Sequence, residues 1–166
     1  MRRTYEGKQM AATVATKTQN QASTVVVARG AVGGLVGGIV GGMAFGMLMQ
    51  MMSFMPKIAM LVGSDSVVIG WVAHMAISMA LGVAFGVIVA RLRAGYAGFA
   101  VLGIMYGVMW WVLGALLLMP AKLGMPTFQF DTMAWQSLMG HMIFGAILGL
   151  ITAAWVRQGS VVHAAK

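Results

Sequence analysis

Four long apolar stretches dominate the chain, and polar residues gather between them and at the two ends. The stretches cover residues 31–55, 67–90, 96–119 and 133–156. A helix needs about 20 apolar residues to cross the hydrocarbon core of a bilayer, so each stretch is long enough to span it. Lipid offers no partners for backbone groups, and no stretch alternates apolar with polar residues, so helix is the expected form. The pattern predicts an all-α integral membrane protein with four transmembrane helices.

The polar segments divide the chain into four parts. We expect residues 1–24 to be a polar N-terminal tail and residues 158–166 to be a C-terminal tail, both cytoplasmic. The N-terminal tail is rich in Thr, Gln and Ala and holds little apolar surface, so alone in water it should be disordered. Between the tails, residues 25–93 and 94–157 each hold two of the predicted helices.

Composition and the placement of charge support this interpretation. Hydrophobic residues make up 60% of the chain and charged residues only 8%, whereas a soluble domain carries about 25% charged residues. The formal net charge is +8, but it is not spread as a nucleic-acid surface would be. Nine basic residues flank one side of the predicted membrane: Arg2, Arg3, Lys8, Lys17, Arg29, Arg91, Arg93, Arg157 and Lys166. Only Lys57 and Lys122 fall on the other side, so both termini are predicted to be cytoplasmic, in an inner (plasma) membrane.

The two halves follow the same order of features. Met55-Pro56 ends the first apolar stretch and Met119-Pro120 ends the third. Each pair is followed by a lysine, an acidic helix start and a second helix that carries His-Met: Lys57, Asp65-Ser66 and His74-Met75, then Lys122, Asp131-Thr132 and His141-Met142. Asp, Ser and Thr are common helix N-caps. The order predicts two tandem two-helix repeats, related by an axis along the membrane normal.

His74 and His141 lie inside predicted spans, where a polar side chain is costly unless it is used. Both belong to stripes of small residues spaced by four, which favour close helix packing, so both should point into the bundle. At 1.5 Å per residue each lies about 13 Å from the outer end of its helix. Three uses are open: a hydrogen bond to a neighbouring helix, axial ligation of haem b by both imidazoles, or a proton or ion path.

Glycine is concentrated in the first span. Two adjacent lines run along it in steps of four: Gly30, Gly34, Gly38, Gly42 and Gly46, then Gly33, Gly37 and Gly41. Together with Gly82, Gly86, Gly145 and Gly149 of the histidine stripes, the first line predicts very close helix packing, either within the chain or with another protein. Room for a lipid, a quinone tail or a pigment is the alternative. Gln50 is expected to bond across a helix interface.

Met43, Met47, Met51 and Met55 follow each other in steps of four on the same stretch. Thioethers suit Cu(I), and this MxxxM spacing resembles the selectivity motif of the eukaryotic copper-uptake channels. That resemblance implies copper transport or handling along the methionine stripe. The rest of the chain does not follow the three-helix pattern of that family, and methionine also serves as adaptable packing filler.

No nucleotide loop, carboxylate pair or nucleophile with its base is present in the sequence, and there is no cysteine. We therefore expect no enzyme activity and no required cofactor, with haem b or copper as alternatives. The expected partners are the lipid bilayer and other membrane-protein subunits, not nucleic acid. The sequence favours an accessory subunit of a larger inner-membrane complex, of a respiratory or photosynthetic electron-transfer kind, acting through glycine-rich helix packing.

Overall fold

A computed structural model of the chain describes residues 2–164, and the regular elements within that range are all helices. In chain order they are α1 (Arg2–Met51), α2 (Met55–Met60), α3 (Val67–Val89), α4 (Tyr96–Trp110), the π-helix η1 (Trp111–Leu118), α5 (Met119–Lys122) and α6 (Thr132–Ala164). Within the described range, four helical stretches are long and apolar enough to cross a membrane: Thr13–Met51, Val67–Val89, Tyr96–Lys122 and Thr132–Arg157. The predicted all-helical chain with four such helices is confirmed.

The N-terminal tail differs from its sequence-based expectation. Disorder was expected through residue 24, but α1 begins at Arg2 and continues without a break into the glycine-rich span. Extending an existing helix costs far less free energy than nucleating a new one, because each added residue brings its own backbone hydrogen bond. The apolar part of α1 therefore provides the nucleus for its polar part. The predicted tail 158–166 is likewise helical as far as Ala164.

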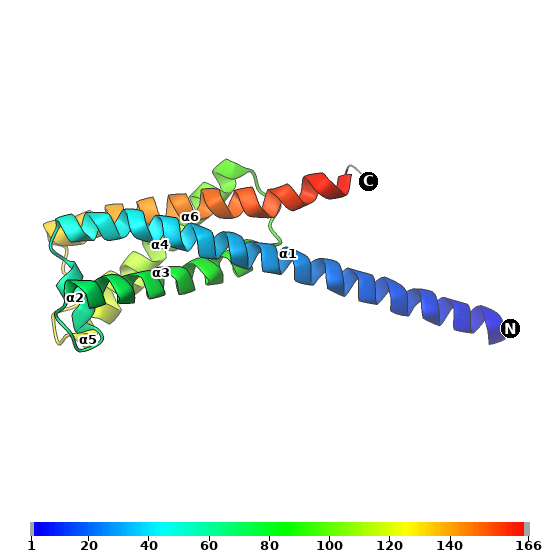
Figure 1. Cartoon of the computed structure of the whole chain (residues 1–166), viewed down its shortest axis with the longest axis horizontal. Helices are drawn as coiled ribbons and strands as arrows, with labels where there is room; N and C mark the ends of the chain where they lie inside the picture. Colours follow the sequence, from blue (N-terminus) through cyan, green and yellow to red (C-terminus); the bar gives the residue numbers. More distant parts are fainter. Residues whose placement is uncertain (1, 165–166) are drawn as a thin grey trace.

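The far end of α1 also differs from the prediction. The helix ends at Met51 and not at Met55, because Ser53 takes a left-handed conformation with φ of 54°. Met55 instead opens α2, with Pro56 in its first turn, where a residue without an N–H is tolerated. Pro120 occupies the same place in α5. Met55-Pro56 therefore begins a separate short helix, whereas Met119-Pro120 begins the last α-helical turn of the continuous stretch Tyr96–Lys122. Both pairs lie at the end of the bundle away from the chain termini (Figure 1).

The predicted third span, 96–119, is one continuous helical stretch whose winding changes within it. Residues Trp111–Leu118 form a π-helix between the α-helical turns of α4 and α5. Of the two expected N-caps, one is present: Asp131 Oδ1 accepts a hydrogen bond from the Ala134 N–H at 2.8 Å. Ser66 stands at the N-cap position of α3, which confirms the predicted helix start, but its side chain makes no cap hydrogen bond.

α1 and α6 form the centre of the bundle. α3 packs against α1, α4 packs against α6, and α1 and α6 pack against each other. Figure 1 shows both chain ends at one end of the bundle and α2 and α5 at the other, with α1 extending well beyond its neighbours. The core is formed by large apolar side chains that include Phe45, Phe85, Phe99, Phe144 and Leu148.

The two glycine lines of α1 contact two different helices of the same chain. The first line lies on α3, where a Cβ on Gly34 would strike the Gly82 carbonyl oxygen and a Cβ on Gly82 would strike that of Gly34. The second line lies on α6, where a Cβ on Gly37 would lie 3.0 Å from the Leu148 carbonyl oxygen. Backbones this close gain van der Waals contact and weak Cα–H···O bonds. α1 is therefore held on two sides by glycine contacts.

The same kind of contact joins α4 to α6. A Cβ on Gly103 would strike the Gly145 carbonyl oxygen, and a Cβ on Gly145 would strike that of Gly103. Gly107 and Gly149 extend this interface toward its two ends. Gln50 also bonds across a helix interface, as expected, since its Oε1 accepts the Trp71 indole N–H of α3 at 3.1 Å.

We predict that Gly34→Ala destabilises the bundle by about 1–3 kcal/mol, the usual cost of overpacking. The added methyl would overlap the backbone of Gly82, which cannot rotate away as a flexible side chain can. Unfolding in mixed micelles with increasing denaturing detergent would measure the change. Gly114→Ala is the matched control, because a Cβ there meets no atom within 4 Å. Equal stabilities of the two variants would contradict the proposed contact.

Candidate functional site

The α3–α4 side of the bundle is the one where neighbouring helices are not packed backbone to backbone. Tyr106 of α4 spans the gap instead, and its hydroxyl donates to the Leu81 carbonyl of α3 at 3.0 Å. On the opposite side of the bundle, α1 presents Gly37 to the Leu148 carbonyl directly. Leu81 lies seven residues after His74 and Leu148 lies seven residues after His141, so the two leucines hold equivalent places in the two halves. Tyr106 therefore holds α3 and α4 apart, whereas Gly37 lets α1 and α6 pack closely.

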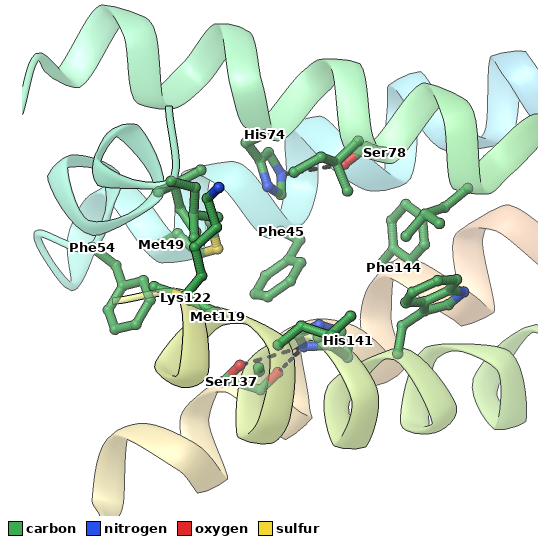
Figure 2. A pocket seen from close by; sticks show the side chains of 18 residues that line it. Phe45, Met49, Phe54, His74, Ser78, Met119, Lys122, Ser137, His141 and Phe144 are labelled. Carbon is green, nitrogen blue, oxygen red and sulfur yellow. Dashed lines mark hydrogen bonds between the residues drawn. The ribbon is translucent and has the colours of Figure 1, made fainter. Parts of the chain in front are cut away.

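This separation leaves a cavity of about 310 Å³ in the half of the bundle that contains α2 and α5, at the lower end of the range for small-molecule sites. α1, α2, α3, α4, η1, α5 and α6 all contribute to its lining. Most of the lining side chains are apolar. The lining residues with polar atoms in their side chains are His74, Ser78, Trp110, Lys122, Ser137 and His141. Figure 2 shows the two histidines entering the cavity from opposite sides, on α3 and on α6.

His74 makes a hydrogen bond between helices. Its Nε2 lies 2.9 Å from the Gly42 carbonyl oxygen of α1. A carbonyl oxygen only accepts, so Nε2 carries the hydrogen and Nδ1 is left as the unprotonated nitrogen. Ser78 Oγ lies 3.5 Å from the same Nε2. The far tip of the His74 ring is therefore used in holding α3 to α1.

His141 bonds within its own helix. Its Nδ1 lies 2.8 Å from the Ser137 carbonyl oxygen, and Ser137 Oγ lies 3.4 Å from the same nitrogen. Nδ1 must carry the hydrogen, which leaves Nε2, at the tip of the ring, as an acceptor. The two histidines are thus held in opposite tautomers, and His141 presents the more accessible bare nitrogen.

Phe45 of α1 lies between the two imidazoles. Its ring centroid is 5.6 Å from that of His74 and 4.7 Å from that of His141, edge to face in both pairs. Figure 2 shows the phenyl ring standing between the labelled histidines. Haem ligated by both histidines would place its iron in this space, which Phe45 fills. The arrangement of side chains therefore does not fit a haem held by His74 and His141.

The methionine stripe does not form a continuous path. Met43, Met47 and Met51 are exposed on the outer face of α1, whereas Met55 is fully buried in α2. The break at Ser53 turns the chain between Met51 and Met55. Copper passing along four successive thioethers would need them on one face, which this break prevents. The thioethers that line the cavity belong to Met49 and Met119, which the spacing of the stripe does not include.

No protein-family model, curated protein or solved structure matches this chain. Its function is therefore inferred from its own residues and their contacts.

Several residues that shape the site were not predicted from the sequence. Gly103 and Gly107 follow the same four-residue spacing as the predicted glycines, so the pattern could have identified them. Phe45, Tyr106 and Gly114 carry no comparable signal, because a single aromatic residue or glycine in an apolar stretch is common. Their role appears only when α3 and α4 are placed side by side.

We predict that the protein purified after expression with added haem shows no Soret band that depends on its histidines. The reason is the Phe45 ring, which stands where the iron would lie. Visible spectra of the wild-type protein, His74→Ala and His141→Ala test this. A wild-type band lost in both variants would show that Phe45 moves aside and that the haem alternative is right.

Proposed function

We propose that the chain is a non-catalytic accessory subunit of a larger inner-membrane complex, and that the N-terminal part of α1 binds its partner. One observation carries this proposal. α1 has 50 residues, which is about 75 Å at 1.5 Å per residue, against a hydrocarbon core of about 30 Å. Roughly half of the helix therefore extends outside the membrane. Figure 1 shows it projecting past the end of the bundle.

The projecting part of α1 lacks the apolar face that would dock it on its own protein. Residues 13–22 are all exposed, and the Thr13 and Thr18 hydroxyls bond carbonyls one turn back on the same helix. A contact near its base comes from Arg91, whose guanidinium donates to Ser23 Oγ at 2.7 Å. A helix that is polar on all sides buries no apolar face and so gains little stability by itself in water. Such helices often bridge to another domain or protein. Binding to a partner subunit would supply the missing tertiary contacts.

The glycine faces are not the surface for this partner. Those of α1 contact α3 and α6, and those of α4 contact α6, all within the chain. The sequence-based hypothesis that glycine packing joins the subunit to a complex is therefore replaced by contact through the exposed part of α1. Lys17 and Arg29 along this part of the helix add positive charge close to the membrane surface, where anionic headgroups attract basic residues.

We further propose that both termini are cytoplasmic. The N-terminal part of α1, the C-terminal part of α6 and the α3–α4 connection lie at the same end of the bundle (Figure 1), and this end carries eight of the ten basic residues between positions 2 and 164. The positive-inside rule assigns such an end to the cytoplasm. The projecting segment of α1 would then meet its partner on the cytoplasmic side.

A tandem duplication would explain the arrangement of the helices. Each half pairs a first helix with a histidine-bearing second helix through reciprocal glycine contacts, Gly34 with Gly82 and Gly103 with Gly145. Each half also has a short Met-Pro helix at the outer end, α2 or α5. We propose that α1–α3 and α4–α6 are two copies of one unit, related by a pseudo-two-fold axis along the membrane normal.

We predict that the orientation can be measured with single cysteines, since the chain contains none of its own. Gln129→Cys, in the exposed loop before α6, should react with a membrane-impermeant maleimide in intact cells. Thr18→Cys, on the projecting part of α1, should react only after the membrane is permeabilised. The reverse labelling pattern would contradict cytoplasmic termini.

Crosslinking tests the accessory role. A photoreactive amino acid at Asn20, on the exposed part of α1, is expected to give one defined protein adduct in native membranes, which mass spectrometry would identify. The control position is Val101, which is exposed on the apolar part of α4 and should yield only lipid adducts. If Asn20 gives no protein adduct and the solubilised protein runs as a monomer, the proposed accessory role is wrong.

A further inference from the structure

The cavity between α3 and α4 reaches the outer surface of the bundle. Ile77 of α3 and Leu118 of η1 both line it, and they remain 46% and 57% exposed. Both belong to membrane-spanning stretches, so the opening between them faces lipid. A molecule dissolved in the bilayer could enter the cavity without crossing water.

Aromatic rings form much of the cavity wall. Phe45, Phe54, Trp110 and Phe144 come from three different helical stretches and the α1–α2 connection. Figure 2 shows the three labelled phenyl rings distributed around the space and not stacked on each other. Aromatic rings pack best against other rings in edge-to-face or offset contacts. This wall favours an aromatic ligand over a simple acyl chain.

The cavity offers a ligand hydroxyl both an acceptor, at His141, and a donor, at Trp110, whose buried indole N–H has no hydrogen-bond partner among the described residues. His141 Nδ1–H is committed to the Ser137 carbonyl, and Nε2 makes no hydrogen bond with any residue that the structure describes. A bare imidazole nitrogen accepts a hydrogen bond and cannot donate one in this tautomer. The matching nitrogen of His74 is already bonded to Gly42. His141 Nε2 is therefore the acceptor best placed to meet a ligand.

Lys122 limits the charge of the ligand. It is the one Lys or Arg among the described lining residues, and it lies at the outer end of the cavity on α5. Its ammonium group disfavours a bound cation, which argues against Cu(I) at the neighbouring Met49 and Met119. No group of three His, Asp or Glu side chains suited to a metal occurs in the described part of the chain. A charged ligand of either sign would also lose its hydration in this largely apolar space, so a neutral ligand is favoured.

We propose that this cavity binds a neutral, lipid-soluble phenol, whose ring packs among the aromatic side chains and whose hydroxyl donates to His141 Nε2. Residues of η1 form part of the cavity wall. π-helical turns often occur at functional sites. Gly114 of η1 lines the cavity, and a Cβ there would meet no atom within 4 Å. The absent side chain at Gly114 leaves room for the ligand. The proposal does not depend on the accessory role.

Binding of para-butylphenol and of its methyl ether to the full chain in nanodiscs tests this proposal. Equilibrium dialysis against protein-free nanodiscs subtracts partition into lipid. The phenol is expected to bind several-fold to tenfold more tightly than the ether, which has the same shape but no hydroxyl. His141→Phe should abolish this preference, whereas Leu113→Phe, on η1 outside the cavity lining, should keep it.

Filling the cavity provides a second, independent test. Gly114→Leu should remove saturable binding of the phenol, and Gly114→Ala should weaken it by a smaller factor. Leu113→Phe is the matched control, because Leu113 lies on η1 outside the cavity lining and should bind as the wild type does. The detergent midpoint of unfolding would show that each variant is folded. Equal binding of phenol and ether, or unchanged binding in folded Gly114→Leu, would overturn the proposal.

Discussion

The close approach of glycine backbones is the constraint on which the rest of the structure depends. In lipid, apolar side chains gain little by leaving their surroundings, so helices associate through van der Waals contact and weak polar interactions at short range. α1 meets α3 and α6 in this way, and α4 meets α6. These three interfaces fix the spacing of all four spans. Any side chain placed at Gly34, Gly82, Gly103 or Gly145 would strike a backbone carbonyl, so the spacing cannot be changed locally.

The fourth interface differs because α4 carries larger residues where α1 carries glycine. Gly42 and Gly107 hold corresponding places, each against the turn that bears a histidine. One residue earlier, α1 has Gly41, packed on Phe144, whereas α4 has Tyr106, which reaches across to Leu81. The cavity between α3 and α4 therefore arises because the second half has Tyr106 where the first half has Gly41. It is not a packing fault, because a specific hydrogen bond maintains the gap.

Much of this architecture could be predicted from the sequence, because it depends on composition over long windows. Three features can be recognised in the sequence alone: the four apolar stretches, the four-residue spacing from Gly30 to Gly46, and the histidines within apolar stretches. The end of α1 could not be predicted in the same way, since the left-handed Ser53 is a local choice in a run of helix-compatible residues. The helical N-terminal segment was also missed, because its own composition favours disorder and only its attachment to a formed span favours helix.

The chemistry of the two histidines was the least predictable feature, although their positions were the clearest signal. Both lie at matching places on small-residue stripes, which suggests equal roles. Their neighbours differ: His74 finds the Gly42 carbonyl of α1 within reach, whereas His141 turns back to the Ser137 carbonyl of its own helix. The acceptor decides which ring nitrogen keeps the hydrogen. His74 therefore makes a hydrogen bond between two helices, whereas His141 keeps an unbonded acceptor nitrogen. The unequal acceptors of the two rings therefore separate a structural histidine from a candidate ligand-binding one.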